Sequence, residues 1–239
     1  MVYIEPFLGA GSLYFAVQPL KAILGDANRS LIHTYKAIRD TPSEVRAELQ
    51  KLINRHSHEH YYLVREAYNR GRESAIQAAR FIYLNKTCFN GIFRVNTRGA
   101  FNVPKGGKDK LTLPTELEYS LVSELLERAE LHGTDYAQTL SLANTGCFVY
   151  LDPPYPPLNE TAYFTHYTSD RFGTESQMSL ASEVKKLHNR GVFFLMSNAD
   201  TPLIRDLYSE FTLEAIPVQR YVSCKGQRIK VSELLIRNY

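Results

Sequence analysis

An acid, two prolines and a tyrosine follow an apolar run in the second half of the chain. Cys147 to Leu151 predicts a buried β-strand, and Asp152-Pro153-Pro154-Tyr155 comes directly after it. Because proline has no backbone N–H to donate to a sheet, the strand must end there in a rigid loop. Such a loop collects a carboxylate, backbone carbonyls and a ring face in one small space. These groups suit a planar amino-substituted base or amide.

The chemistry of an amino group explains why these residue types matter. The exocyclic nitrogen of adenine is a weak nucleophile, because its lone pair is conjugated into the ring. Oxygens that accept both N–H bonds favour the pyramidal nitrogen, whose lone pair is free to attack. We therefore interpret Asp152 and the Pro153 carbonyl as the groups that hold and polarise the nitrogen. The alternative is an ordinary turn, since Asp before Pro is common in loops.

A glycine-bearing bend near the N-terminus indicates a nucleoside ligand. The stretch from Val2 to Ser12 predicts a short strand, a bend with two glycines, and Ser12 as the N-cap of a helix from Leu13. The stretch from Ala22 to Asp26 is a second apolar strand that ends in an acid. In α/β nucleotide binders an acid at this place holds ribose hydroxyls. Strand, glycine bend, helix, strand and acid together predict a nucleoside site.

Five blocks of the sequence resemble the DNA adenine methylase family, the D12 class of N6-adenine methyltransferases, which use S-adenosylmethionine. Several blocks in the family's order are far more specific than any one motif. The blocks are EPFLGAGS at 5 to 12, GDAN at 25 to 28, LNKTCFNGIFRVNTRGAFNVPKG at 84 to 106, DPPYPPLNETAYFTHY at 152 to 167, and MSNAD at 196 to 200.

The resemblance implies an α/β fold: a Rossmann-like S-adenosylmethionine-dependent methyltransferase sheet with an inserted, mainly helical target recognition domain. We assign residues 1–40 and 114–239 to the catalytic domain and residues 41–113 to the insertion. The pattern also predicts alternating strands and helices, typical of a mainly parallel sheet. The expected elements are helices Ser30 to Asp40, Pro114 to Leu131, 175 to 190 and 202 to 208, strands Val192 to Ser197 and Phe211 to Ile216, and a closing hairpin from Val218 to Tyr239.

The same resemblance implies which residues meet the cofactor. Phe7, Gly9 and Gly11 would shape the methionine side of the site, and Asp26 would hold the ribose. Glu5 would complement the methionine ammonium group; its alternative role is a hydrogen-bond acceptor at the end of a strand.

One further pair aligns with the family's adenine-pocket loop. Asp135 would accept from the amino group of the cofactor's adenine, and Tyr136 would flank its ring. The alternative for Asp135 is the N-cap of the next helix.

Basic residues gather between positions 80 and 110. This stretch holds seven Lys and Arg residues against one acid, whereas the whole chain has a net charge of only +3. A basic loop with interleaved aromatic rings fits a segment that neutralises phosphates and stacks on bases, although a solvated surface would look similar. Phe93 and Phe101 are more typical of local core packing.

By resemblance, this loop reads duplex DNA. Arg94 suits bidentate contact with guanine O6 and N7, and Phe89 would fill the stack when the target base leaves it. The similarity of the loop from Phe89 to Arg94 to members that methylate adenine in GATC leads us to expect that palindrome. The expected DNA-binding residues are Phe89, Asn90, Ile92, Arg94, Asn96 and Lys105.

The composition argues against several other classes of protein. No apolar run reaches the ~18 residues that span a bilayer, so we expect a cytoplasmic protein without a membrane partner. Cys88, Cys147 and Cys224 are widely separated, which predicts free thiols rather than disulfides or a zinc site. No acid or cysteine at zinc-site spacing accompanies His56, His58 and His60, and we interpret these histidines as a solvated surface. We expect no metal, and nothing indicates an obligate protein partner.

One departure keeps alternative functions open. Family members usually carry a Lys-Trp-x-Gly-Gly-Lys segment upstream of the glycine bend, and this sequence begins at Met1-Val2-Tyr3. A non-catalytic DNA-binding relative is therefore one alternative. Methylation of RNA or of a protein glutamine is another, although the loops of such enzymes more often begin with Asn. The favoured function is methyl transfer from S-adenosylmethionine to adenine N6 in duplex DNA, with no metal and no covalent enzyme intermediate.

Overall fold

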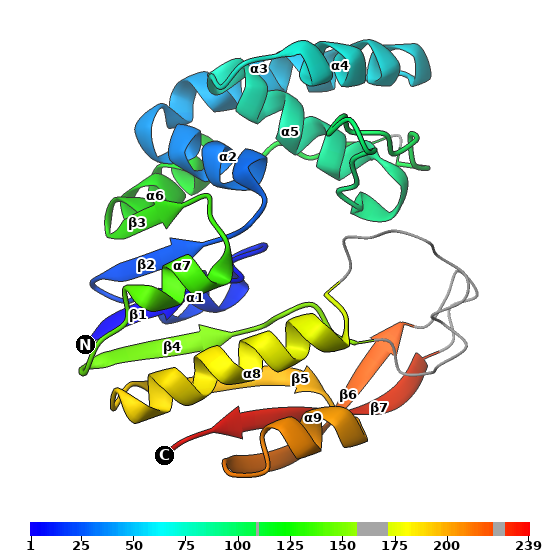
Figure 1. Cartoon of the computed structure of the whole chain (residues 1–239). Coiled ribbons are helices and arrows are strands. Elements are labelled where there is room, and N and C mark those ends of the chain that lie inside the picture. Colours follow the sequence, from blue (N-terminus) through cyan, green and yellow to red (C-terminus); the bar gives the residue numbers. More distant parts are fainter. Residues whose placement is uncertain (109, 157–171, 222–227) are drawn as a thin grey trace. The chain divides into compact units, whose positions relative to one another are not determined.

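The computed structural model of the chain describes residues 1–108, 110–156, 172–221 and 228–239 (Figure 1). The chain divides into two compact units, which we call the sheet unit and the helical unit. The sheet unit comprises Met1–Ala10, Pro19–Gly25 and Asp135–Tyr239, and the helical unit comprises Gly11–Gln18 and Asp26–Thr134. The assignment of residues 41–113 to an inserted domain stays a prediction.

In the part of the chain that the structure describes, seven strands form one sheet in the order β3-β2-β1-β4-β5-β7-β6. β1 pairs in parallel with β2 and β4, and β4 pairs in parallel with β5, whereas β7 is antiparallel to both β5 and β6. The predicted mainly parallel α/β sheet is therefore confirmed. The strands are β1 (Val2–Glu5), β2 (Ala22–Gly25), β3 (Ala129–His132), β4 (Cys147–Leu151), β5 (Phe193–Ala199), β6 (Thr212–Tyr221) and β7 (Arg228–Arg237).

The strand order places the site-forming loops. Ile4 of β1 pairs with Ile23 on one side and with Val149 of β4 on the other. The order of the strands in the sequence reverses between β1 and β4, and α/β sheets bind ligands at the carboxyl ends of strands at such a point. Since β1 and β4 are parallel, Glu5 at the end of β1 and Asp152 directly after β4 lie at the same edge of the sheet.

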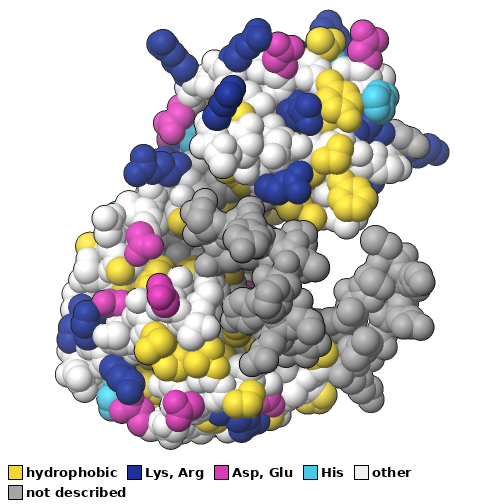
Figure 2. All heavy atoms as spheres, turned by 45° about the vertical axis from the view of Figure 1, so that its right-hand side comes forward, with side chains coloured by type: hydrophobic (Ala, Val, Ile, Leu, Met, Phe, Trp, Pro, Cys, Tyr) yellow, Lys and Arg dark blue, Asp and Glu magenta, His cyan; other side chains and the backbone are white. Residues whose placement is uncertain are grey.

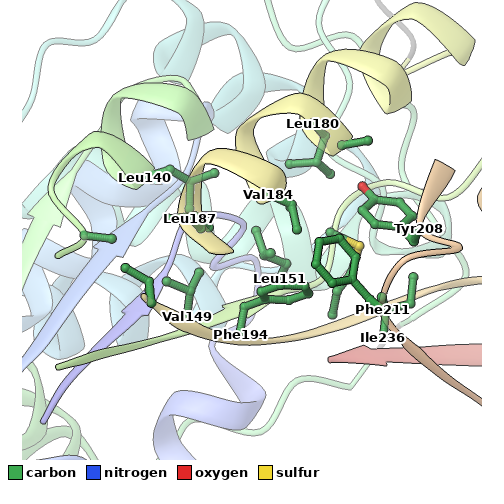
Figure 3. Packing of buried hydrophobic residues seen from close by; sticks show 14 of the residues in the cluster. Leu140, Val149, Leu151, Leu180, Val184, Leu187, Phe194, Tyr208, Phe211 and Ile236 are labelled. Carbon is green, nitrogen blue, oxygen red and sulfur yellow. The ribbon is translucent and has the colours of Figure 1, made fainter. Parts of the chain in front are cut away.

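The core of the sheet unit lies under α8 (Thr174–Asn189), with α7 (Tyr136–Ser141) and α9 (Pro202–Leu207) beside it. Leu180, Val184 and Leu187 recur at helical spacing, so they share one face of α8. All three are fully buried, and Figure 3 shows them pointing toward the sheet, where Val149 and Phe194 meet them. Alternate residues of β4 are buried in the same way, as the period of a strand requires.

The helical unit is built on a second core. Its helices are α1 (Ser12–Val17), α2 (Arg29–Asp40), α3 (Pro42–Asn54), α4 (His58–Arg70), α5 (Ala75–Thr87) and α6 (Glu116–Glu127), with a 3₁₀ turn at Phe89–Gly91. Ser57, Ser74 and Thr115 cap α4, α5 and α6 with their side-chain oxygens. Tyr61 and Tyr83 are among the largest fully buried side chains of this core.

Two local predictions about helix ends were wrong. Ser12 does not cap α1: Gly11 occupies the N-cap in a left-handed conformation with φ of 66°, and no side chain caps the helix. The helix expected from Pro114 to Leu131 ends at Glu127, and Ala129–His132 forms strand β3. In a segment of only four residues, the alternation of apolar and polar residues cannot be distinguished from a helical pattern.

The histidine stretch does not behave as a merely solvated surface. His56 Nδ1 lies 2.7 Å from the Tyr83 hydroxyl, and His56 Nε2 lies 3.0 Å from the carbonyl oxygen of Lys108. Because that carbonyl can only accept, Nε2 donates to it, and Nδ1 shares a second hydrogen bond with the Tyr83 hydroxyl. His58 is exposed, as expected.

The described residues contain neither a candidate membrane span nor a candidate metal site. None of their helices combines the length and the apolar character needed to cross a membrane, and no three His, Cys, Asp or Glu side chains come together as metal ligands would. Cys88 and Cys147 are buried free thiols, whereas Cys224 lies outside the described residues.

Candidate active site

The Asp-Pro-Pro-Tyr loop begins where β4 ends. Pro153 is buried and Asp152 is exposed, so the carboxylate faces outward from the end of the strand. Its Oδ1 accepts a hydrogen bond of 2.7 Å from the hydroxyl of Ser197 in β5. Ser197 is only 8% exposed, so the surrounding atoms restrict the position of its hydroxyl. The carboxylate is therefore oriented by the neighbouring strand as well as by its own loop.

Tyr155 completes the loop as a half-buried ring. Its hydroxyl donates to Glu233 Oε2 of β7 across 3.3 Å. Burial is the main cause that raises the pKa of the Tyr155 phenol, and the nearby carboxylates of Asp152 and Glu233 raise it further. The ring therefore stays neutral at physiological pH.

The loop has a third attachment, from the helix above the sheet. Gln177 of α8 donates from Nε2 to the carbonyl oxygen of Pro154 across 2.9 Å. Asn198 of β5 donates in turn to Gln177 Oε1 across 3.2 Å, and both amide side chains are fully buried. Sequence reasoning missed these two residues. The only available signal was the position of Asn198 inside the MSNAD block.

Glu5 lies at the end of β1, buried to 3% exposure. The Tyr3 hydroxyl donates to Glu5 Oε2 across 2.7 Å, which gives Glu5 the role of a strand-end acceptor. Burial first, and then Glu5, raises the pKa of Tyr3 above its usual range, so this donor is neutral. The role of Glu5 toward an ammonium group stays a prediction.

Three rings meet beside the glycine bend. Phe7 stacks on Tyr136 with centroids 5.2 Å apart, and Phe172 meets both rings edge-on at 5.8 Å. The structure thus brings together two residues expected at opposite ends of the cofactor, and adds Phe172, which sequence reasoning missed. Gly9 has a φ of 49°, a conformation that L side chains rarely adopt, and a Cβ there would meet no atom within 4 Å.

Gly25 and Asp135 position the neighbouring helix α7. A Cβ on Gly25 would lie 2.3 Å from Oγ1 of Thr139, which is buried in α7, so only glycine allows this approach. Asp135 caps α7, and its Oδ1 accepts from the backbone N–H of Ala137 at 2.8 Å. The expected alternative role of Asp135 as an N-cap is confirmed. Its contact with a cofactor stays a prediction.

Gly11 and Asp26 belong to the helical unit. Gly11 is the N-cap of α1. Asp26 Oδ1 accepts from the backbone N–H of Asn28 at 2.8 Å, so the carboxylate stabilises the turn that begins α2. The order strand, acid, helix agrees with the expected nucleoside-binding pattern.

The stretch 89–105 of the helical unit, which we call the recognition loop after its expected role, exposes some of its apolar residues and buries others. Phe89 and Ile92 are each 47% exposed, whereas Phe101 is only 3% exposed and Phe93 packs against the same core. The expectation that Phe93 and Phe101 serve the core is confirmed. Figure 2 shows exposed hydrophobic side chains lying among Lys and Arg side chains on this unit.

Polar residues of the same loop shape its turns. Arg94 Nε donates to Asn102 Oδ1 at 2.9 Å, across an isolated bridge between Val95 and Phe101. Asn96 Oδ1 accepts from the backbone of Arg98 and Ala100, so this side chain closes the tip.

Two further members of the expected DNA-binding set flank this tip. Asn90 adopts a left-handed conformation with φ of 54°. Lys105 pairs with Cys88 in a second isolated bridge, and its Nζ donates to the Gly106 carbonyl at 3.2 Å. The six residues expected to bind DNA therefore lie on one continuous stretch of this unit.

Comparison with known proteins agrees with the geometry. Residues 1–222 match the family model of the D12 class N6 adenine-specific DNA methyltransferases. A type II methyltransferase of Lactococcus lactis subsp. cremoris is 36% identical over 99% of this chain and 86% of its own length. A type II methyltransferase of Methanocaldococcus jannaschii is 35% identical over 99% and 88%, and the DNA adenine methylase of Escherichia coli is 37% identical over 97% and 84%.

Proposed function

Since the chain belongs to the D12 class of N6 adenine-specific DNA methyltransferases, we propose that it transfers a methyl group from S-adenosylmethionine to adenine N6 within duplex GATC. The observation that carries this proposal is the Asp152 carboxylate at the carboxyl end of β4, held by Ser197 beside the neutral ring of Tyr155. Enzymes that act on a base inside a duplex first extrude it into their active site.

The roles of the loop residues follow from their hydrogen-bonding capacity. Asp152 Oδ1 already accepts from Ser197, and a carboxylate oxygen pair has capacity for further donors. The carboxylate and the Pro153 carbonyl would each accept one N–H of the adenine amino group, which leaves the nitrogen lone pair free. Tyr155 would stack on the base. Holding the nitrogen in line with the methyl group can be worth roughly 7 to 11 kcal/mol.

The residues around the glycine bend fit S-adenosylmethionine. Gly9 leaves open space where any other residue would add a side chain, and Glu5 offers a buried carboxylate suited to an ammonium group. Phe7 and Tyr136 offer ring faces beside it, and Asp26 an acceptor for ribose hydroxyls. When bound, the cofactor supplies an electrophilic methyl group on a positively charged sulfur.

Substitution of Asp152 tests the proposed role. We expect Asp152→Ala to abolish methylation of duplex DNA while duplex affinity stays nearly unchanged, because the carboxylate acts on the reacting nitrogen. Methylation is followed with labelled cofactor, and affinity by fluorescence anisotropy. The exposed Asp206→Ala serves as a matched control that should retain activity. An equal loss of affinity and activity in Asp152→Ala would count against the assignment.

Sequence specificity belongs to the recognition loop, and we assign residues 41–113 as the inserted domain that carries it. Arg94 is exposed, and its bond from Nε to Asn102 orients the guanidinium whose two outer nitrogens would meet guanine O6 and N7. We expect Arg94→Ala to cost about 1 to 3 kcal/mol of discrimination at one guanine. Mapping methylated adenines in an unmethylated plasmid tests this. Modification scattered outside GATC, unchanged by Arg94→Ala, would overturn both the site and the role.

A further inference from the structure

Two apolar series in the sheet unit each end in a buried amide. In β5, Phe194 and Met196 face the core, and the next residue of that face is Asn198. On α8, Leu187, Val184 and Leu180 face the same core, and one turn further along that face comes Gln177. Both amides are fully buried, at positions where the pattern would otherwise continue with an apolar side chain.

A buried amide is costly unless its polar atoms are paired. Here each atom has a partner: the Ala199 N–H donates to Asn198 Oδ1 at 2.8 Å, Asn198 Nδ2 donates to Gln177 Oε1, and Gln177 Nε2 donates to the Pro154 carbonyl. The hydrogen bonds run in one direction and end on the loop. The two amides therefore act together to donate one hydrogen bond to the Pro154 carbonyl.

The neighbouring residue of β5 acts on the same loop from the other side. Successive side chains of a strand point to opposite faces. Asn198 points to the α8 face, so Ser197 points away from it, and its hydroxyl donates to Asp152. Two consecutive residues of one strand thus hold the loop at two places, Asp152 directly and Pro154 through Gln177.

We infer that Gln177, oriented by Asn198, is a positioning residue for methyl transfer. A peptide group is planar, so a hydrogen bond to the Pro154 carbonyl also fixes the orientation of the peptide that leads into Tyr155. It also directs this carbonyl toward Gln177 of α8, whereas the proposed function uses the Pro153 carbonyl for the substrate. This inference rests on the proposed function, since it assigns what orients the proposed substrate-binding loop.

The variant Gln177→Glu isolates the donated hydrogen bond. It keeps the size of the side chain, but an ionised carboxylate cannot donate to a carbonyl, whereas a protonated one can. Burial raises the pKa of a carboxyl group. We expect the single-turnover rate of methyl transfer to fall about tenfold at about pH 8, the equivalent of one hydrogen bond, with duplex affinity unchanged. The ratio to the parent rate should recover as the pH is lowered to about 5.5.

Two further variants separate positioning from stability. Val184→Ala lies two turns along the same face of α8 and is fully buried, but it contacts the core rather than the loop. It should lower the melting temperature and leave the single-turnover rate unchanged. Asn198→Asp removes the donor to Gln177 Oε1 and should also lower the rate. A loss in Gln177→Glu that does not depend on pH, or that Val184→Ala reproduces at equal melting temperature, would overturn the inference.

A fluorescent reporter tests the inference without catalysis. The chain has no Trp, so Tyr155→Trp introduces one reporter in the loop. In that background, Gln177→Glu should increase quenching by acrylamide at about pH 8 and reverse it at about pH 5.5, and Val184→Ala should do neither. If the parent protein transfers no methyl group to DNA, the proposed function fails and this measurement alone decides the positioning role. Quenching unaffected by Gln177→Glu would refute it.

Discussion

Three tyrosines of the sheet unit combine burial with a hydrogen bond of the hydroxyl group. Tyr3, Tyr150 and Tyr155 all have pKa values raised chiefly by burial, and each hydroxyl lies within hydrogen-bond distance of a carboxylate or of Ser197. Neutral phenols donate to these groups without adding charge next to Asp152 and Glu5. Under the proposed function, the same two acids would meet ligands that carry donors.

Two substitutions of Tyr155 separate the contribution of its ring from that of its hydroxyl. Phe keeps the ring and loses the hydroxyl with its bond to Glu233, so we expect Tyr155→Phe to retain much of the activity. Tyr155→Ala should lose base stacking worth ~1 to 3 kcal/mol, seen as a lower kcat/KM. If Tyr155→Ala lowered the melting temperature but left kcat/KM unchanged, the ring would serve only the core.

The hydrogen bond of Tyr3 should stabilise the folded protein by an amount that depends on pH. Tyr3→Phe removes a donor from the buried Glu5 carboxylate and should cost about 1 to 3 kcal/mol of unfolding free energy at pH 7. The folded pKa of Tyr3 is raised, so its stabilising contribution is complete below about pH 10, where the unfolded phenol ionises, and declines above it by about 1.4 kcal/mol per pH unit. Urea unfolding of both proteins measures this. A gap that widens above pH 10 would contradict it.

At the scale of elements, the long periodic segments were predictable and the short or interlocked ones were not. The helix expected at 175 to 190 is α8 (Thr174–Asn189), because its apolar spacing extends over four turns. β3 has four residues, too few for a periodic signal. The pairing of Tyr3 with Glu5 could have been found, since residues two apart share a face of a strand. The bond between Gln177 and Pro154 could not, since 23 residues separate them.

Helix α7 provides a test that separates capping from ligand binding. Asn caps a helix as well as Asp, so Asp135→Asn should leave stability unchanged, whereas Asp135→Ala should cost about 0.5 to 2 kcal/mol. If Asp135 also accepts from the cofactor's adenine, Asp135→Asn should weaken binding of S-adenosylmethionine in calorimetry. Unchanged cofactor affinity in both variants would restrict Asp135 to its structural role.

At the scale of the whole molecule, positive charge is concentrated rather than abundant. The net charge is +3, yet seven basic residues fall between positions 80 and 110. Under the proposed function, charge so placed would contribute to DNA affinity through phosphate contacts, which are independent of sequence and weaken with salt. Base reading by Arg94 would be a separate contribution, so the two should respond differently to substitution.

Salt dependence distinguishes these contributions. Lys105→Ala or Lys108→Ala should weaken binding to every duplex alike and reduce the slope of log affinity against log salt by about 1. Lys186→Ala is the matched control, an exposed lysine on α8 paired with Glu183. A change confined to GATC-containing duplexes would assign these lysines to base reading instead.

The place of β7 in the sheet determines when the protein can finish folding. β7 (Arg228–Arg237) follows β6 in the sequence but lies between β5 and β6, and among the described strands β6 hydrogen-bonds only to β7. As the chain emerges from the ribosome, β6 therefore appears before its partner, and the edge of β5 stays open. Unpaired strand edges invite pairing with other chains. The nascent protein is thus most exposed to aggregation in the interval between synthesis of β5 and of β7.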